Sequence, residues 1–92
     1  MFKYSFSEEL KFKIKKLVKK DKKKTDIIYR KVKQIITCDE ETINHYKNLR
    51  HDLSEFKRVH IDKQFVLAFK VDIKNNFILF TDFDHHDRIY KK

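Results

Sequence analysis

The chain has 92 residues without a single glycine or proline, so we expect one small domain over residues 1–92 that lacks the glycine-rich phosphate loop and the dinucleotide-binding fingerprint. Hydrophobic residues make up 40% and charged residues another 40%, which supplies a folded core and excludes a disordered polyelectrolyte. Its 23 lysine and arginine residues outnumber 14 aspartate and glutamate residues, and the net charge of +9 favours a polyanionic partner such as nucleic acid.

The N-terminal half predicts a strand followed by two helices. Apolar and polar residues alternate over residues 2–6, as in a short strand. Ser7 followed by two glutamates is typical of a helix N-cap. The lysines at 22–24 are expected to end this helix, and Thr25 is expected to cap the next one. Residues 8–38 should therefore form an antiparallel helical hairpin.

The C-terminal half predicts three strands. Apolar residues recur with period two, or run continuously, over 56–61, 65–71 and 77–82. Asn75 and Asn76 are the best candidates for positive φ in the second turn, because asparagine tolerates that region. The fold class is therefore α+β in the order β-α-α-β-β-β, with the helical hairpin packed on one face of a small antiparallel sheet.

The second predicted strand divides its side chains between two faces, because neighbouring residues of a strand point to opposite sides. Val59 and Ile61 are expected to face the helices. Arg58 and His60 then point together onto the open face, where a ligand could reach them. The next two strands are apolar on both sides, so the open face needs partial cover from the C-terminal Ile89–Tyr90 or from a protein partner.

The densest group of polar residues is the segment 82–90, after the last predicted strand. If it forms a helical turn, Asp82, His86 and Tyr90 lie on one side. Histidine titrates near neutral pH and can donate or accept a proton, as cleavage of RNA by its own 2′-hydroxyl requires. Because His85 and His86 are adjacent they point in different directions, and no pair has metal-ligand spacing, so neither a metal nor another cofactor is expected.

Simpler interpretations compete with a functional site. The lysine run from Lys11 to Lys24 could be only a solvated helix face. A single strand histidine such as His60 is more often held by structural hydrogen bonds. The placement of Arg58 on the same face as His60 favours a functional site.

The single cysteine, Cys38, cannot form an internal disulfide. No apolar run is long enough for a signal peptide or a membrane span. We therefore expect a cytoplasmic protein with no membrane partner.

Four segments of the chain resemble a known group of toxins. They are Tyr46–Leu53, Phe56–Ile61, Phe65–Phe69 and Asp84–Tyr90. Together with the order of elements, they resemble the RelE/ParE toxin superfamily, and most of all its YafQ-like branch. The resemblance implies a RelE-like fold and a toxin of a type II toxin–antitoxin system. Such a toxin is a ribosome-dependent endoribonuclease, or mRNA interferase, that inhibits translation and is neutralised by a cognate antitoxin protein.

The resemblance also implies roles for individual residues. His60 matches the family's histidine on the second strand, and His86 matches its C-terminal histidine. Phe65 matches the aromatic residue that opens the third strand, and Tyr90 matches the terminal aromatic residue. We therefore expect His60 and His86 to act as base and acid, with a codon base stacked on Phe65 or Tyr90. Arg58 would hold the scissile phosphate.

Three positions depart from the family pattern. Lys47 stands where the family has a histidine, Gln64 where it has an acidic residue, and Asp82 where an arginine is expected. The missing arginine removes a cation from the phosphate site, and we expect Arg58, Lys47 or Arg88 to supply one instead.

Basic side chains are expected to anchor the protein in ribosomal RNA by phosphate contacts, because displaced counterions supply much of such affinity. Messenger RNA and ribosomal RNA on the ribosome are thus the expected partners. The expected catalytic group is His60, His86, Tyr90 and Arg58. The residues expected to bind RNA are Lys11, Lys15, Lys19, Lys47, Arg50, Phe65 and Arg88.

Two other functions stay open from the sequence. A ParE-like toxin would poison a DNA topoisomerase without RNA chemistry of its own. A non-catalytic basic module would bind RNA or DNA, with purely structural histidines. The histidines and Tyr90 argue against the topoisomerase poison, because that role needs no proton carriers.

Overall fold

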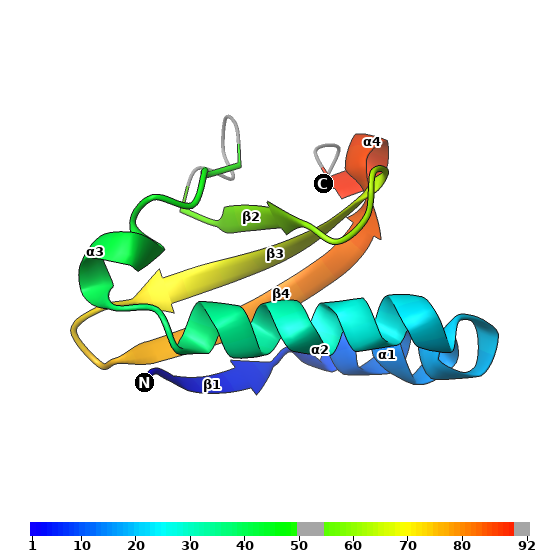
Figure 1. Ribbon diagram of the computed structural model, residues 1–92, viewed down its shortest axis with the longest axis horizontal. Helices are drawn as coiled ribbons and strands as arrows, with labels where there is room; N and C mark the ends of the chain where they lie inside the picture. Colours follow the sequence, from blue (N-terminus) through cyan, green and yellow to red (C-terminus); the bar gives the residue numbers. More distant parts are fainter. Residues whose placement is uncertain (50–54, 90–92) are drawn as a thin grey trace.

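The computed structural model describes residues 1–49 and 55–89, in which a pair of helices lies across one face of a four-stranded sheet (Figure 1). The elements are β1 (Lys3–Phe6), α1 (Glu8–Lys20), α2 (Lys22–Ile36), α3 (Glu40–Ile43), β2 (Lys57–His60), β3 (Phe65–Asp72), β4 (Phe77–His85) and α4 (His86–Ile89). The strand order is β1-β4-β3-β2. The predicted α+β fold is confirmed, with one addition: β1 pairs with β4 in parallel, and the other pairs are antiparallel.

The predicted N-cap of the first helix is confirmed. The backbone N–H of Leu10 donates to Ser7 Oγ at 3.1 Å, which satisfies one of the unpaired donors at the start of α1. The same hydroxyl donates to the carbonyl of Thr81 at 2.6 Å. Ser7 therefore fixes the start of α1 against β4.

The predicted start of the second helix is wrong. Asp21 caps α2, because its carboxylate accepts from the N–H of Lys24 at 3.0 Å. Lys22–Lys24 thus form the first turn of α2 instead of ending α1. Thr25 is buried inside α2, and its hydroxyl donates to the Asp21 carbonyl at 3.0 Å. The physical reason is that one carboxylate between the helices is sufficient as a cap, and lysine favours helix.

The predicted helical turn over residues 82–90 is also wrong in its first half. β4 continues to His85, because residues 82–85 pair with β3 in a register that places Asp82 opposite Ala68 and His85 opposite Phe65. The helical turn begins only at His86. Asp82 and His86 therefore do not share a helix face, and Tyr90 lies outside the described residues.

The core lies between the sheet and the two long helices. Leu67, Phe69, Ile78 and Phe80 have no exposed surface and pack in one cluster with the apolar stripes of α1 and α2. Val59 and Ile61 join this cluster, as predicted.

A smaller apolar cluster covers part of the opposite face. It contains the buried Leu49, Val66, Ala68 and Ile89, with Phe56 packed against them. The predicted cover by Ile89 is confirmed, whereas the contribution of Leu49 was not predicted. Arg58 and His60 of β2 lie on this face, and so do the partly exposed Phe77 and Leu79 of β4, whose neighbours Ile78 and Phe80 point into the core.

The two remaining turns differ in how well they were predicted. Asn76 has a φ of 53°, which confirms the expected positive φ in the β3–β4 turn. The short helix α3 was not predicted; Asp39 caps it by accepting from the N–H of Thr42 at 2.7 Å, and this hydrogen bond lowers the pKa of Asp39.

No helix in the described ranges is both long and apolar enough to cross a membrane.

Candidate active site

The structure brings His60 and His86 together on the open face. His60 is the last residue of β2 and is exposed, and His86 is the first residue of α4 with 45% of its side chain exposed. Their ring centroids are 6.0 Å apart, and the rings are nearly parallel at 16°. Both imidazoles can therefore reach one small ligand from the same side.

A backbone hydrogen bond joins the two chain segments that carry these histidines. The N–H of His86 donates to the carbonyl of Gln64 at 2.7 Å. Gln64 belongs to the turn between β2 and β3, so the bond holds the start of α4 beside the end of β2. Position 64 lacks the family's acidic side chain, but the backbone carbonyl of Gln64 holds His86 in position.

Asp87 lies beside the imidazole of His86. One carboxylate oxygen is 3.5 Å from His86 Nδ1, and Asp87 is mostly exposed. A carboxylate near Nδ1 favours the proton on that nitrogen and leaves Nε2 free for proton exchange with a ligand. Asp87 can therefore orient His86.

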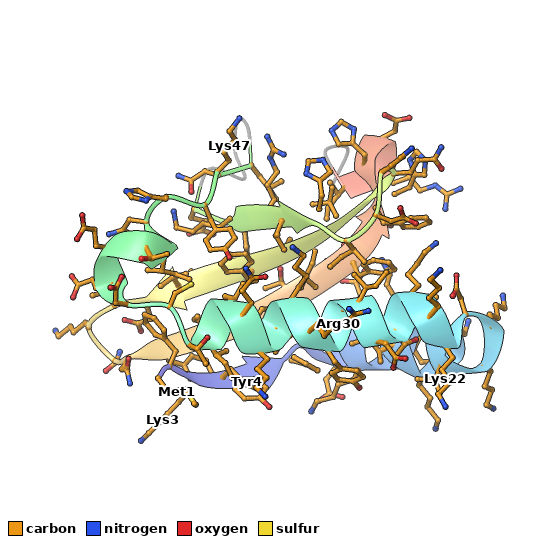
Figure 2. All side chains as sticks on the ribbon, in the orientation of Figure 1. Met1, Lys3, Tyr4, Lys22, Arg30 and Lys47 are labelled. Atoms are coloured by element: carbon orange, nitrogen blue, oxygen red, sulfur yellow. The ribbon has the colours of Figure 1, made fainter. Side chains whose placement is uncertain are left out.

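Arg58 and Lys47 share a cavity with His60. The cavity has a volume of about 300 Å³, and its lining also includes His45, Tyr46 and Val59. Arg58 lies two residues before His60 in β2, which places both on one face, as predicted. The N–H of Arg58 donates to the Lys47 carbonyl at 2.9 Å, and Figure 2 shows Lys47 on the loop before β2. Two of the three expected replacement cations thus lie beside His60.

His45 and Tyr46 were missed by the sequence analysis as lining residues. Tyr46 packs edge-on against Phe69, with ring centroids 5.6 Å apart, and burial raises its pKa. Its hydroxyl therefore stays neutral over a wider pH range. In the sequence, the two residues are marked only by their place at the segment that resembles the toxins: His45 directly precedes it and Tyr46 begins it.

Phe65 does not join the histidine pair. Its ring stacks on Phe83 on the helix side of the sheet, with centroids 5.2 Å apart. Lys24 Nζ lies 3.9 Å from the centre of the Phe65 ring, and the His85 ring meets its edge at 5.6 Å. The two adjacent histidines thus point in different directions, His85 to Phe65 and His86 to His60.

The other expected RNA-binding residues are distributed over different surfaces. Arg88, the third candidate for the missing cation, lines a separate cavity with lysines of α1. Asp82, at the position of the family's arginine, pairs with Lys13 Nζ at 2.6 Å. Lys11, Lys15 and Lys19 are exposed on α1, and Arg50 lies outside the described residues.

No metal-binding group is found among the residues that the structure describes. A site would need three or more histidine, cysteine, aspartate or glutamate side chains that converge, and the described parts of the chain contain no such group. The charged and imidazole side chains around His60 are instead the cations Arg58 and Lys47 and two further imidazoles, His45 and His86, a set suited to an anionic ligand.

Comparison with known sequences decides the family. The chain is 56% identical over 79 residues to the protein named "Putative toxin RelE4" of Methanocaldococcus jannaschii, and the match covers 86% of this chain and 80% of that protein. The chain belongs to the RelE family of toxins. An uncharacterized protein of Methanosarcina mazei is 42% identical over 98% of this chain and all of its own length. No family model matches this RelE-type chain.

Solved structures share the fold of this RelE-type toxin at low sequence identity. The crystal structure of YafQ from Escherichia coli strain BL21(DE3) matches with a TM-score of 0.74 at 15% identity, over 98% of this chain and 99% of YafQ. The metal-bound toxin from Helicobacter pylori matches at 0.76 and 19%, over 97% and 99%. The toxin–antitoxin complex RelBE2 from Mycobacterium tuberculosis gives 0.60 and 17%, over 92% and 98%. This RelE-type chain therefore has the fold of these solved toxin structures.

Proposed function

We propose that this RelE-type toxin is an endoribonuclease that cuts messenger RNA on the ribosome by attack of a ribose 2′-hydroxyl on the adjacent phosphate. The observation that carries the proposal is the pair of accessible imidazoles, His60 and His86, 6.0 Å apart beside a cavity that contains Arg58 and Lys47. Two proton carriers and a cation are what this reaction needs.

Each group has a defined task in the reaction. One imidazole of the His60–His86 pair removes the proton of the 2′-hydroxyl as its oxygen attacks phosphorus. The other imidazole gives a proton to the 5′-oxygen that leaves. The products are a 2′,3′-cyclic phosphate and a 5′-hydroxyl end, so no water and no oxidant is consumed.

Arg58 and Lys47 stabilise the charge that develops on the phosphate oxygens. An arginine can donate two parallel hydrogen bonds to a phosphate, and such interactions strengthen as negative charge grows in the transition state. Their placement beside His60 compensates for the aspartate at position 82, whose carboxylate is occupied by Lys13.

The remaining surface would bring the enzyme to its substrate. The exposed Lys11, Lys15 and Lys19 on α1 would contact ribosomal RNA, with Arg50 and Tyr90 as further contacts to RNA. A cognate antitoxin protein is the expected inhibitor, since the RelBE2 neighbour is a toxin–antitoxin complex. Action on ribosomes places the protein in the cytoplasm.

The proposal is tested by cleavage of messenger RNA on purified programmed ribosomes. His60→Ala and His86→Ala are each expected to slow cleavage by about 10²–10⁴-fold, the usual contribution of a general acid or base. Tyr29→Ala is the control, because it removes an exposed aromatic ring from α2, on the helix-covered side of the sheet. Cleavage at the wild-type rate in both His60→Ala and His86→Ala would disprove the proposal and favour a toxin without RNA chemistry.

A further inference from the structure

A second basic cavity lies between α1 and the end of β4, on the helix side of the sheet. Its volume is about 380 Å³. The charged residues in its lining are Lys13, Lys16, Lys20, Arg88 and Asp84. Four cations and one carboxylate give this lining a net charge of +3.

The cations of this cavity differ in how far they are neutralised. Lys13 Nζ lies 2.6 Å from Asp82 and 3.2 Å from Asp84, so its charge is compensated within the protein. Among the described residues, no carboxylate lies within salt-bridge distance of Lys16, Lys20 or Arg88. Three like charges around one hollow repel each other, and a bound anion relieves that repulsion.

An aromatic ring forms part of the same cavity. Phe65 lines it, and the ring is held in place by stacking on Phe83. Lys24 Nζ adds a further cation 3.9 Å from the ring centre. Because Phe83 stacks on the ring and Lys24 lies over it, the ring serves as an apolar wall, and the cations of the lining attract the phosphates of a nucleic acid.

The cavity is connected to the histidine pair through two consecutive residues. The His85 ring lies 5.6 Å from that of Phe65 on the helix side. The next residue, His86, stacks on His60 on the open face. The end of β4 and the start of α4 therefore lie between the cavity, which Asp84 and Arg88 line, and the histidine pair.

We propose that this cavity binds phosphates of the same single-stranded RNA that is cut at His60 and His86, next to the scissile phosphate. This proposal rests on the proposed RNA-cleaving function. The substrate strand is favoured over ribosomal RNA because the cavity adjoins the histidine pair. Lys11, Lys15 and Lys19 lie on the opposite flank of α1, as the helical repeat requires, and do not line the cavity.

The test measures the salt dependence of binding to a single-stranded RNA oligonucleotide whose 2′-hydroxyls are methylated, so that it cannot be cut. The variant Lys16→Gln/Lys20→Gln/Arg88→Gln removes the three cations of the lining that have no carboxylate partner among the described residues. The control Lys3→Gln/Lys33→Gln/Lys74→Gln removes the same charge from exposed lysines of β1, of the last turn of α2 and of the β3–β4 turn, segments that lie far from α4 (Figure 1).

The slope of log affinity against log salt is expected to fall by about 2 in the cavity variant, because each phosphate contact to a single strand contributes about 0.7. The control is expected to change it by less than about 0.7, the contribution of one contact. Equal changes in both variants would overturn the proposal. So would an unchanged slope in the cavity variant with weaker ribosome binding, which would assign the cavity to ribosomal RNA.

The outcome is independent of cleavage, because the probe cannot react. If His60→Ala and His86→Ala cut messenger RNA normally while the cavity variant loses slope, the proposed catalytic function fails and the RNA-binding cavity stands. If the histidine variants are inactive and the slope is unchanged, the cavity proposal fails alone.

Discussion

The two faces of the sheet are built for different purposes. On the helix-covered face, side chains such as Phe69 and Phe80 are fully buried in one large apolar cluster. On the open face, only a small apolar cluster covers the strands, and His60 with Arg58 stands beside it. Because the first face supplies most of the apolar burial, the second can keep polar groups exposed for a ligand. Substitutions on the two faces should therefore separate stability from activity.

The largest expected effect on stability comes from the covered face. Phe80→Ala is expected to lower the free energy of unfolding by about 3–5 kcal/mol, because it leaves a cavity where no surface is exposed. Phe12→Ala, at a side chain that is 59% exposed, should change it by less than about 0.5 kcal/mol. Urea unfolding measures both. Similar losses in the two variants would contradict the assignment of the core.

A next, smaller effect is expected from the cation on the open face. Arg58→Gln is expected to lower kcat for messenger cleavage by about 10²–10³-fold, the range measured when one group that stabilises a developing oxyanion is lost. Arg30→Gln removes the same charge from the exposed surface of α2 (Figure 2) and should leave kcat unchanged. An equal loss in both variants would mean that only overall charge matters.

The smallest effect concerns Tyr46, which lies between the two faces. Burial raises its pKa above the ordinary value of 10.0. A raised folded-state pKa stabilises the fold fully below the unfolded value and is lost as pH rises through the folded value. The wild type should therefore lose free energy of unfolding above about pH 10 more steeply than Tyr46→Phe. Parallel curves in alkaline denaturation would show that Tyr46 does not contribute.

The helix-covered face could be predicted from the sequence because burial makes apolar residues recur with the period of a strand or a helix. The alternation in β2 assigned Val59 to the core and Arg58 with His60 to the open face, and the apolar spacing gave both helices. The predicted boundary between the two helices was wrong because two residues nearby both satisfy the N-cap preference. Asp21 and Thr25 are both good N-caps, and only the packing of the hairpin decides which one is used.

The arrangement of residues on the open face depends on features that leave no periodic pattern in the sequence. Pairing with β3 decides where β4 ends. It places His85 beside Phe65, and the helical turn begins at the next residue, His86. From the lysine run, the sequence predicted Lys11, Lys15 and Lys19 to bind RNA and did not single out Lys16 or Lys20. The structure divides the run, because Lys16 and Lys20 line a cavity with Arg88. Contacts between residues far apart in the sequence bring Lys16 and Lys20 together with Arg88, and the local sequence around each residue does not reveal these contacts.

We propose that His60 and His86 act on one phosphodiester in the same step. A double-mutant cycle on programmed ribosomes tests it most directly, by comparing cleavage rates of His60→Ala, His86→Ala and the double variant. Residues that act as a unit are strongly non-additive, so the double variant should be no slower than the slower single variant. A double variant whose loss equals the product of the two single losses would show that the histidines act independently, and would contradict the account.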